Sequence, residues 1–346
     1  MRLARRHVPI VAGIALSIVF LAVAIGDTRP AEVLHIAREH VRWPLLALFL
    51  VPYAIFFLLK SARWALLLRP YQRVTIGSMW PITQLGYAAN ILLPMQLGEI
   101  ARAYLAARRF NSNTAPFLAS IALERVFDLA AILVTVALVL PQLDGEPHPI
   151  RSMMYVVVTF TAVGLLTLCI YVGYTRAVLA TADKLLAFLP ARLHAWLLQQ
   201  LTKGARGLEA LRQAHLLGGV ALLSIAMWGV MALACVVLLQ AMGIDAGPAA
   251  AVFTLFVSAI GLALPTAPGF VGTIQLAFVV ALVPFGVTHA EALAASLGYN
   301  ALITVPPLIV AMILLLFRRL CAALPVSVEQ AVEHGCNPPA GNSPHF

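Results

Sequence analysis

Six long apolar runs dominate this sequence, and each has about the length of a helix that crosses a lipid bilayer. A membrane-spanning helix needs about 20 apolar residues, and a helix satisfies all of its backbone hydrogen bonds within one segment. The sequence therefore predicts an all-α polytopic membrane protein with about six full transmembrane helices. The runs are Val8–Gly26, Trp43–Leu59, Thr114–Leu140, Met153–Tyr174, Leu216–Met242 and Ala290–Phe317.

Composition supports that class, because 62% of the 346 residues are hydrophobic and 11% are charged, against about half and a quarter in soluble domains. The net charge is +9, but the basic residues lie beside apolar runs, where they set the orientation in the membrane. We therefore expect no nucleic-acid partner. The four cysteines form no CxxC pair and the nine histidines show no metal-ligand spacing, so we expect no metal and no cofactor.

The distribution of Lys and Arg predicts the orientation of the chain, because loops rich in these residues stay in the cytoplasm. With the N-terminus inside, eighteen of the 23 lie on the cytoplasmic side, four lie outside, and Arg125 falls within a span. Both termini are therefore expected in the cytoplasm. We expect residues 1–320 to form one integral membrane domain and residues 321–346 a disordered cytoplasmic tail. The first run also resembles a secretory signal, but its length favours a retained helix.

Two further regions are apolar but are broken by proline and glycine. Gly77–Gly98 contains Pro81 and Pro94, and Ala249–Phe285 contains the sequence PTAPGFVG. In the orientation above, each region has both flanks on one side of the membrane, and the two regions enter from opposite sides. Each is either a re-entrant hairpin or a pair of short crossings, which would give eight helices. Broken segments of opposite sidedness are typical of transporters built from inverted repeats.

The stretch LERVFDLAAIL places Glu124, Arg125 and Asp128 inside an apolar run. Glu124 and Asp128 are four residues apart and share one helix face, and Arg125 is three residues from Asp128. A charge in the middle of a bilayer costs at least about 2.5–3.5 kcal/mol, so three charges together need partners or water. The cluster therefore either lines a polar cavity or clips helices together.

Polar residues also surround the two breaks. NILLPMQLGEIARAY carries Glu99, which is a candidate to pair with Arg125 across helices. LPTAPGFVGTIQ carries irregular backbone, which is stable at membrane depth only inside protein or beside a cavity. Each break is alternatively a turn at the membrane edge. The predicted site residues are Asn90, Pro94, Gln96, Gly98, Glu99, Arg102, Glu124, Arg125, Asp128, Pro265, Pro268, Gly269, Gly272, Gln275 and Asn300.

Taken in order, NILLPMQLGEIARAY, ERVFDLAAI and PTAPGFVGTIQ resemble the transmembrane region of lysylphosphatidylglycerol synthases, a flippase-like domain, over most of the chain. The resemblance implies a lipid-translocating domain with re-entrant helices around a central cavity. In full synthases a separate soluble domain transfers the amino acid. We expect a stand-alone member without that domain, and therefore no enzyme.

The sequence departs from this family pattern at three positions. Gln96 and Asn300 stand where the family often has Arg, and Gln275 stands where it often has an acid. Our hypothesis is that the cavity is less charged than usual and accepts a less polar headgroup.

Together with this resemblance, which implies a phospholipid, a polyprenyl-linked lipid or a hopanoid-type lipid as substrate, these features predict a lipid transporter of the bacterial inner membrane. Arg102 and Arg125 would hold phosphate or hydroxyl groups, and Glu99, Glu124 and Asp128 would orient the arginines. The alternative is a non-transporting accessory or assembly protein for a lipid- or envelope-modifying enzyme, and an intramembrane transferase is a third class. The expected partners are a membrane lipid as substrate and either a lipid-modifying enzyme or further copies of the chain.

Overall fold

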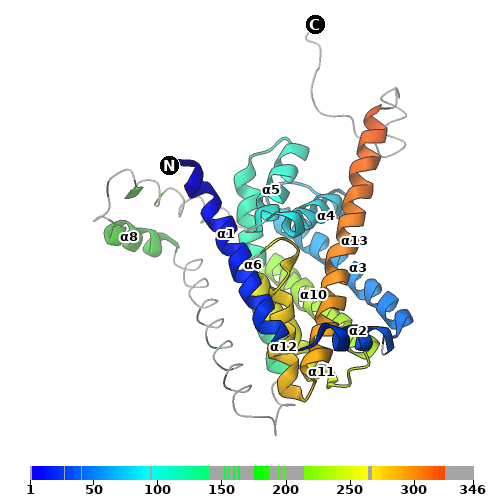
Figure 1. Ribbon diagram of the computed structural model, residues 1–346. Helices are drawn as coiled ribbons and strands as arrows, with labels where there is room; N and C mark the ends of the chain where they lie inside the picture. Colours follow the sequence, from blue (N-terminus) through cyan, green and yellow to red (C-terminus); the bar gives the residue numbers. More distant parts are fainter. Residues whose placement is uncertain are drawn as a thin grey trace.

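The computed structural model describes residues 2–26, 28–39, 41–93, 96–139, 175–186, 214–263 and 267–323, together with a few single positions between 152 and 198. Every regular element in this part of the chain is a helix (Figure 1). The all-helical fold predicted from the apolar runs is therefore confirmed. The predicted run Met153–Tyr174 lies outside the described residues except for single positions, and so do residues 324–346 of the predicted tail 321–346. Residues 321–323 instead form the end of a helix, α13 (His289–Ala323).

Long apolar helices form the frame of the molecule. Within the described residues, four segments qualify as membrane spans by length and composition. Helices α1 (Arg2–Ile25) and α2 (Pro30–Glu39) add a fifth if their bent pair counts as one broken span. The four segments are Trp43–Leu68, which is α3; Leu216–Ala241 within α10 (Ala214–Ala241); Pro268–Phe285; and His289–Phe317 within α13 (His289–Ala323).

Helix α6 (Thr114–Val139) is as long as α3 but carries three charged residues between its eleventh and fifteenth positions. The shorter helix α8 (Thr175–Leu186) has Lys184 in its last turn.

The first broken segment forms a helical hairpin of α4 (Ile76–Leu92) and α5 (Leu97–Arg109). Thr75 and Ser78 form a capping box at the start of α4, which satisfies backbone N–H groups that a helix leaves free. The two helices pack closely because Gly98 has no side chain. A Cβ atom there would overlap the backbone of Gly86 and Asn90. Pro94, which lies between the helices in sequence, is outside the described residues.

The second broken segment forms the opposing hairpin. It consists of α11 (Gly247–Ala263), the short 3-10 helix η4 (Pro268–Phe270), α12 (Thr273–Leu282) and the 3-10 helix η5 (Val283–Phe285). Gly272 has a φ of +86°, and a Cβ atom on it would meet the carbonyl oxygen of Ser17 in α1. Only glycine combines that φ with so close an approach. Pro265 lies outside the described residues.

The two hairpins come from opposite ends of the bundle and meet inside it (Figure 1). The α4–α5 hairpin lies toward the end that holds the N-terminus, whereas α11 and α12 start and finish at the other end. Where they meet, Gln96 adopts a left-handed conformation with φ 54° and ψ 31°. Its side-chain nitrogen donates a 2.5 Å hydrogen bond to the carbonyl oxygen of Leu262. The opposite sidedness predicted for the two segments is thus present in the fold.

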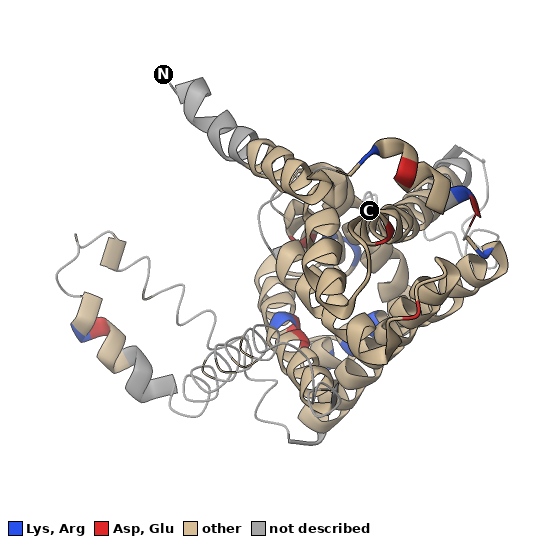
Figure 2. Ribbon diagram, turned by 60° about the horizontal axis from the view of Figure 1, so that its bottom comes forward, with Lys and Arg blue, Asp and Glu red and all other residues tan. Residues whose placement is uncertain are grey.

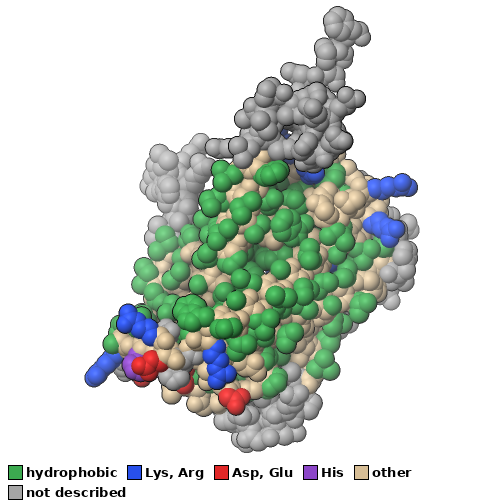
Figure 3. All heavy atoms as spheres, turned by 90° about the vertical axis from the view of Figure 1, so that its right-hand side faces the viewer, with side chains coloured by type: hydrophobic (Ala, Val, Ile, Leu, Met, Phe, Trp, Pro, Cys, Tyr) green, Lys and Arg blue, Asp and Glu red, His purple; other side chains and the backbone are tan. Residues whose placement is uncertain are grey.

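The outer surface of the bundle is apolar. Figure 3 shows a face covered by hydrophobic side chains, with charged side chains confined to its two ends. Leu222 and Leu138 are each 69% exposed, and similar side chains occur on α1, α3 and α13. Soluble monomers rarely expose contiguous apolar patches larger than a few hundred Å². The surface therefore suits lipid as its surroundings.

Candidate functional site

A cavity of about 380 Å³ lies where the two hairpins meet the long helices. Residues of α3, α4, α5, α6, α10, α11, η4 and α13 line it. Its wall combines charged side chains, such as Lys60 and Arg125, with aromatic and aliphatic ones, such as Tyr87 and Met231. In Figure 2 the ribbon is largely free of charge, but basic and acidic positions lie together within the bundle. The cavity is therefore suited to an amphiphilic ligand.

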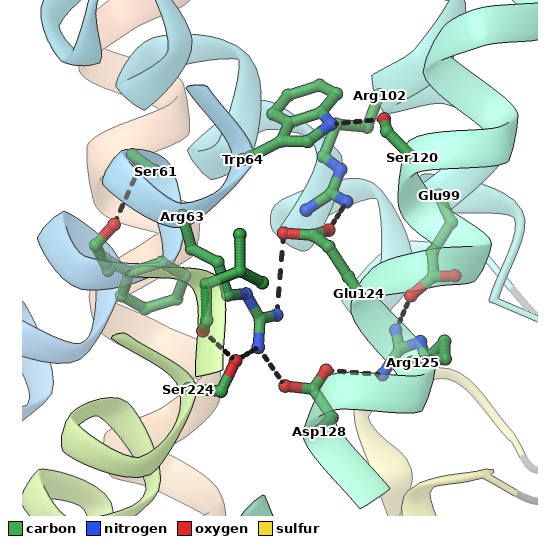
Figure 4. Close-up of polar contacts among 12 residues, drawn as sticks. Ser61, Arg63, Trp64, Glu99, Arg102, Ser120, Glu124, Arg125, Asp128 and Ser224 are labelled. Carbon is green, nitrogen blue, oxygen red and sulfur yellow. Dashed lines mark hydrogen bonds and ion pairs between the residues drawn. The ribbon is translucent and has the colours of Figure 1, made fainter. Parts of the chain in front are cut away.

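Arg63 of α3 is at the centre of the charged network behind this cavity (Figure 4). Its side chain is fully buried. One terminal nitrogen donates hydrogen bonds to Asp128 Oδ1 at 2.6 Å and to Ser224 Oγ at 2.9 Å, and the other lies 3.5 Å from Glu124 Oε1. Arg63 thereby joins α3 to α6 and α10. Asp128 also accepts a 3.1 Å hydrogen bond from the Trp228 indole.

Arg102 of α5 extends the network to the first hairpin. It forms an ion pair with the second carboxylate oxygen of Glu124, and its guanidinium lies 4.2 Å from the ring centroid of Trp64. The Trp64 indole donates a 2.9 Å hydrogen bond to Ser120. A Cβ atom at Gly86 would come within 2.6 Å of Arg102 Cβ, so this glycine leaves room for the arginine between α4 and α5.

Arg125 and Glu99 form the exposed part of the network. They make an ion pair between α6 and α5, as predicted, and Arg125 also lies 3.9 Å from Asp128 Oδ2. The Arg125 side chain is 49% exposed, whereas that of Asp128 is 7% exposed. Arg125 is eleven residues into α6, about 16 Å along its axis at 1.5 Å per residue. This distance is close to half the thickness of a bilayer core, which is about 15 Å.

The charged cluster of α6 was predicted either to line a cavity or to clip helices together, and it does both. Glu124 is 2% exposed and holds Arg63 and Arg102 from two other helices. Asp128 and Arg125 of the same cluster line the cavity.

The predicted site residues fall into two groups along the chain, a first group from Asn90 to Asp128 and a second group from Pro265 to Asn300. The structure brings most of the first group to the cavity wall, whereas the described residues of the second group do not line it. Seven predicted residues line the cavity, and these are Asn90, Gln96, Gly98, Glu99, Arg102, Arg125 and Asp128. Five described residues of the second group are absent from its lining, and these are Pro268, Gly269, Gly272, Gln275 and Asn300.

The second group instead shapes the tip of the α11–α12 hairpin. Gln275 Oε1 accepts a 2.7 Å hydrogen bond from the Gly272 backbone, and Asn300 Nδ2 donates a 3.1 Å hydrogen bond to the Gly269 carbonyl. The hypothesis of a less charged cavity therefore depends, among its three positions, on Gln96, which does line the cavity. Gln275 and Asn300 hold backbone.

Several cavity residues escaped prediction from the sequence. Lys60 and Arg63 follow the apolar run Trp43–Leu59 and fall among the cytoplasmic loop charges by that pattern, but α3 continues to Leu68. That assignment is wrong, since Arg63 is buried and Lys60 lines the cavity. Arg102 is likewise buried. Without these three residues, fifteen of the eighteen Lys and Arg residues assigned to the cytoplasmic side remain in the loops. The signal available in the sequence was the three-residue spacing of Lys60 and Arg63, which matches one helix face.

Aromatic side chains form much of the remaining wall. Tyr53 donates a 2.9 Å hydrogen bond to the Ile303 carbonyl in α13. Its ring lies edge-on to Phe57 at 5.1 Å, and Tyr87 packs edge-on against Phe57 at 5.1 Å. Edge-to-face pairs of this kind are favourable at centroid distances of about 4.5–7 Å. They fix α3, α4 and α13 around the cavity.

An apolar helical bundle with a charged cavity between two opposed hairpins defines a multi-pass membrane protein that can hold a polar group within its interior. Comparison with known families places the chain more closely. Residues 10–311 match the family described as the lysylphosphatidylglycerol synthase TM region, and the chain belongs to that family.

A similar protein is the glycosyltransferase AglD of Haloferax volcanii. It is 29% identical over 328 residues, which cover 84% of this chain and 51% of the relative. The chain therefore spans about half the length of the curated relative that it matches. No solved structure matches the chain.

Proposed function

We propose that this protein binds a membrane lipid by its headgroup in the cavity and moves that headgroup across the bilayer. The observation that carries the proposal is the charged cavity of about 380 Å³ between two hairpins of opposite sidedness. Charges at membrane depth are costly and mark substrate pathways in membrane proteins. Family membership supports the same proposal.

The cavity wall matches the two ends of a lipid. Arg125 and Glu99 lie at its exposed edge, where a headgroup would first meet protein charge in place of water. Leu129 also lines the cavity and is 49% exposed, so the tail has an apolar surface to follow. A headgroup would then be held inside while its tail stays in the bilayer.

In this mechanism, the contact between the two hairpins controls access to the cavity. The hydrogen bond from Gln96 to Leu262 closes the space between α5 and α11. Alternating access in transporters with broken helices proceeds by movement of one such unit against the other. Rupture and re-formation of this contact would expose the cavity to the two sides in turn.

Transport without a chemical step fits the state of the carboxylates. A general base needs an accessible lone pair within reach of its substrate. Glu124 is held by Arg63 and Arg102, and Asp128 by Arg63, Arg125 and Trp228. We therefore favour a transporter over an intramembrane transferase that uses either carboxylate as base.

Substitution of Arg125 tests the proposal. In proteoliposomes that carry fluorescent phospholipid, polyprenyl phosphate or hopanoid analogues, we expect Arg125→Gln to slow translocation at least ten-fold. The change leaves Glu99 without its cation at the cavity edge, where it repels a phosphate. Because Arg125 is half-exposed, the thermal unfolding midpoint should stay within a few degrees of the wild-type value.

Arg108→Gln is the matched control. Arg108 is an exposed arginine near the end of α5 that contacts Tyr104 and does not line the cavity, so its loss should leave the rate unchanged. Equal rates for Arg125→Gln and Arg108→Gln would contradict the proposed role of the cavity.

The second candidate is an accessory or assembly protein for a lipid- or envelope-modifying enzyme. The similarity to a protein named as a glycosyltransferase favours keeping it. If the purified protein moves no candidate lipid while Arg125→Ala disrupts lipid modification in cells, this candidate replaces the transporter.

We propose that the protein lies in the inner membrane with both termini in the cytoplasm, because fifteen Lys and Arg residues in loops still fall on that side against four on the other.

A further inference from the structure

The charges in and behind the cavity do not balance. Three acidic side chains are each paired with arginine, and one cation is left over. The basic residues are Lys60, Arg63, Arg102 and Arg125, and the acidic residues are Glu99, Glu124 and Asp128.

The unbalanced cation is Lys60. It lines the cavity, and among the described residues no carboxylate is paired with it. Its ammonium lies 5.9 Å from the ring centroid of Phe56, on the preceding turn of α3. A cation inside a membrane protein needs a counter-charge or water. Glu124 and Asp128 act on Lys60 from a distance, and each is already paired with arginine. A bound anion would supply the direct counter-charge that the described residues do not.

Some residues of the cavity wall also carry buried polar atoms that have no hydrogen-bond partner among the described residues. Ser258 is 1% exposed and lines the cavity, and its hydroxyl has no partner in the described part of the chain. The buried Nε of Arg102 likewise has no acceptor there. Buried polar groups are normally satisfied, so these atoms are available to donate hydrogen bonds to ligand oxygens.

We propose that Lys60 selects a compact lipid headgroup with a net negative charge, namely a phosphate ester with a small substituent. This inference rests on the proposed function, because it names the headgroup class of the same cavity. The volume sets the size limit, since about 380 Å³ is at the small end of the roughly 300–1,000 Å³ of ligand sites. A phosphate with glycerol suits this space better than an oligosaccharide.

Competitive lipid binding to the detergent-solubilised protein, followed by native mass spectrometry, measures this selectivity directly. The probes are phosphatidylglycerol, phosphatidylcholine and monoglucosyl diacylglycerol with identical tails, and soluble glycerol phosphate. For wild type we expect phosphatidylglycerol to bind at least ten-fold tighter than the other two lipids, which corresponds to about 1.4 kcal/mol. Soluble glycerol phosphate should bind far more weakly, because it lacks the tail.

Variants at Lys60 locate the origin of the preference. Lys60→Gln should reduce it to two-fold or less, Lys60→Arg should retain it, and Lys60→Glu should reverse it, so that phosphatidylglycerol binds more weakly than the other two lipids. Lys184→Gln is the control, because Lys184 is exposed on α8 and is outside the cavity lining. Elution of each variant as a monodisperse peak in size-exclusion chromatography confirms that it is folded.

The outcomes separate this inference from the proposed function. Equal binding of the three lipids to wild type, or a preference that survives Lys60→Gln and Lys60→Glu, overturns the inference even if translocation is observed. A preference that depends on Lys60 without any translocation supports the inference and rejects transport. Glycerol phosphate that binds as tightly as phosphatidylglycerol also overturns it, because the site would then recognise a soluble ester.

Discussion

Arg63→Met is expected to destabilise the protein severely. The substitution keeps much of the side-chain volume but removes the cation that joins Asp128, Glu124 and Ser224. Loss of one partner from a buried ion pair costs about 3–5 kcal/mol, because the other charge is left without compensation. Thermal unfolding in detergent, followed by fluorescence-detected size-exclusion chromatography, should show a large drop in the midpoint or no folded protein.

Two further variants isolate the charge from the packing. Arg69→Met changes an exposed arginine near the end of the same helix and should leave the midpoint close to that of wild type. The double variant Arg63→Met with Asp128→Asn removes one charge of each sign and keeps an acceptor for Trp228. It should recover at least half of the lost stability. A double variant as unstable as Arg63→Met would assign the effect to volume.

Gly98→Ala is expected to separate the helices of the first hairpin. The added methyl group would overlap the Gly86 carbonyl oxygen and the Asn90 backbone nitrogen. Overpacking costs about 1–3 kcal/mol when side chains can adjust, and backbone atoms adjust less. We therefore expect a loss of about 3 kcal/mol in stability together with loss of lipid translocation, since Gly98, Asn90 and Gln96 all line the cavity.

Gly77→Ala is the matched control in the same hairpin. No atom lies within 4 Å of a Cβ at this position in the first turn of α4. Alanine is a better helix former than glycine by up to about 1 kcal/mol, so the midpoint should stay or rise. Opposite signs for two glycine-to-alanine changes in one hairpin would locate the effect in the contact. A Gly98→Ala protein with normal stability and transport would show that the hairpin tolerates the separation.

The sequence predicted the parts of the fold that depend on local chemistry. Runs of apolar residues gave the helices, and proline with glycine marked both breaks. The pairing of Glu99 with Arg125 followed from charge complementarity at membrane depth, where each ion needs a partner. The ion pair in the structure confirms it. These predictions need only the residue types in a segment and the low dielectric constant of the membrane around it.

The parts that escaped prediction depend on contacts between distant segments. Arg63 looked like a loop residue, because its acidic partners are 61 and 65 residues further along the chain. The apolar run ended at Leu59 by hydropathy, although the helix continues to Leu68 through Lys60, which lines the cavity, and Arg63, which is paired with carboxylates in the fold. Gln275 and Asn300 looked like cavity residues, but each instead binds backbone of the second hairpin. Nothing in their local sequence separates these two roles.

The arginine network also bears on how the protein is made. Helix α6 carries three charges, and each costs about 2.5–3.5 kcal/mol at the centre of an inserting helix. Its buried counter-ions, Arg63 and Arg102, precede it in the chain. Chains emerge from the ribosome N-terminal segment first, so α3 and the first hairpin are available when α6 reaches the translocon. The order of the helices along the chain thus gives Glu124 and Asp128 of α6 a basic partner before they have to enter lipid.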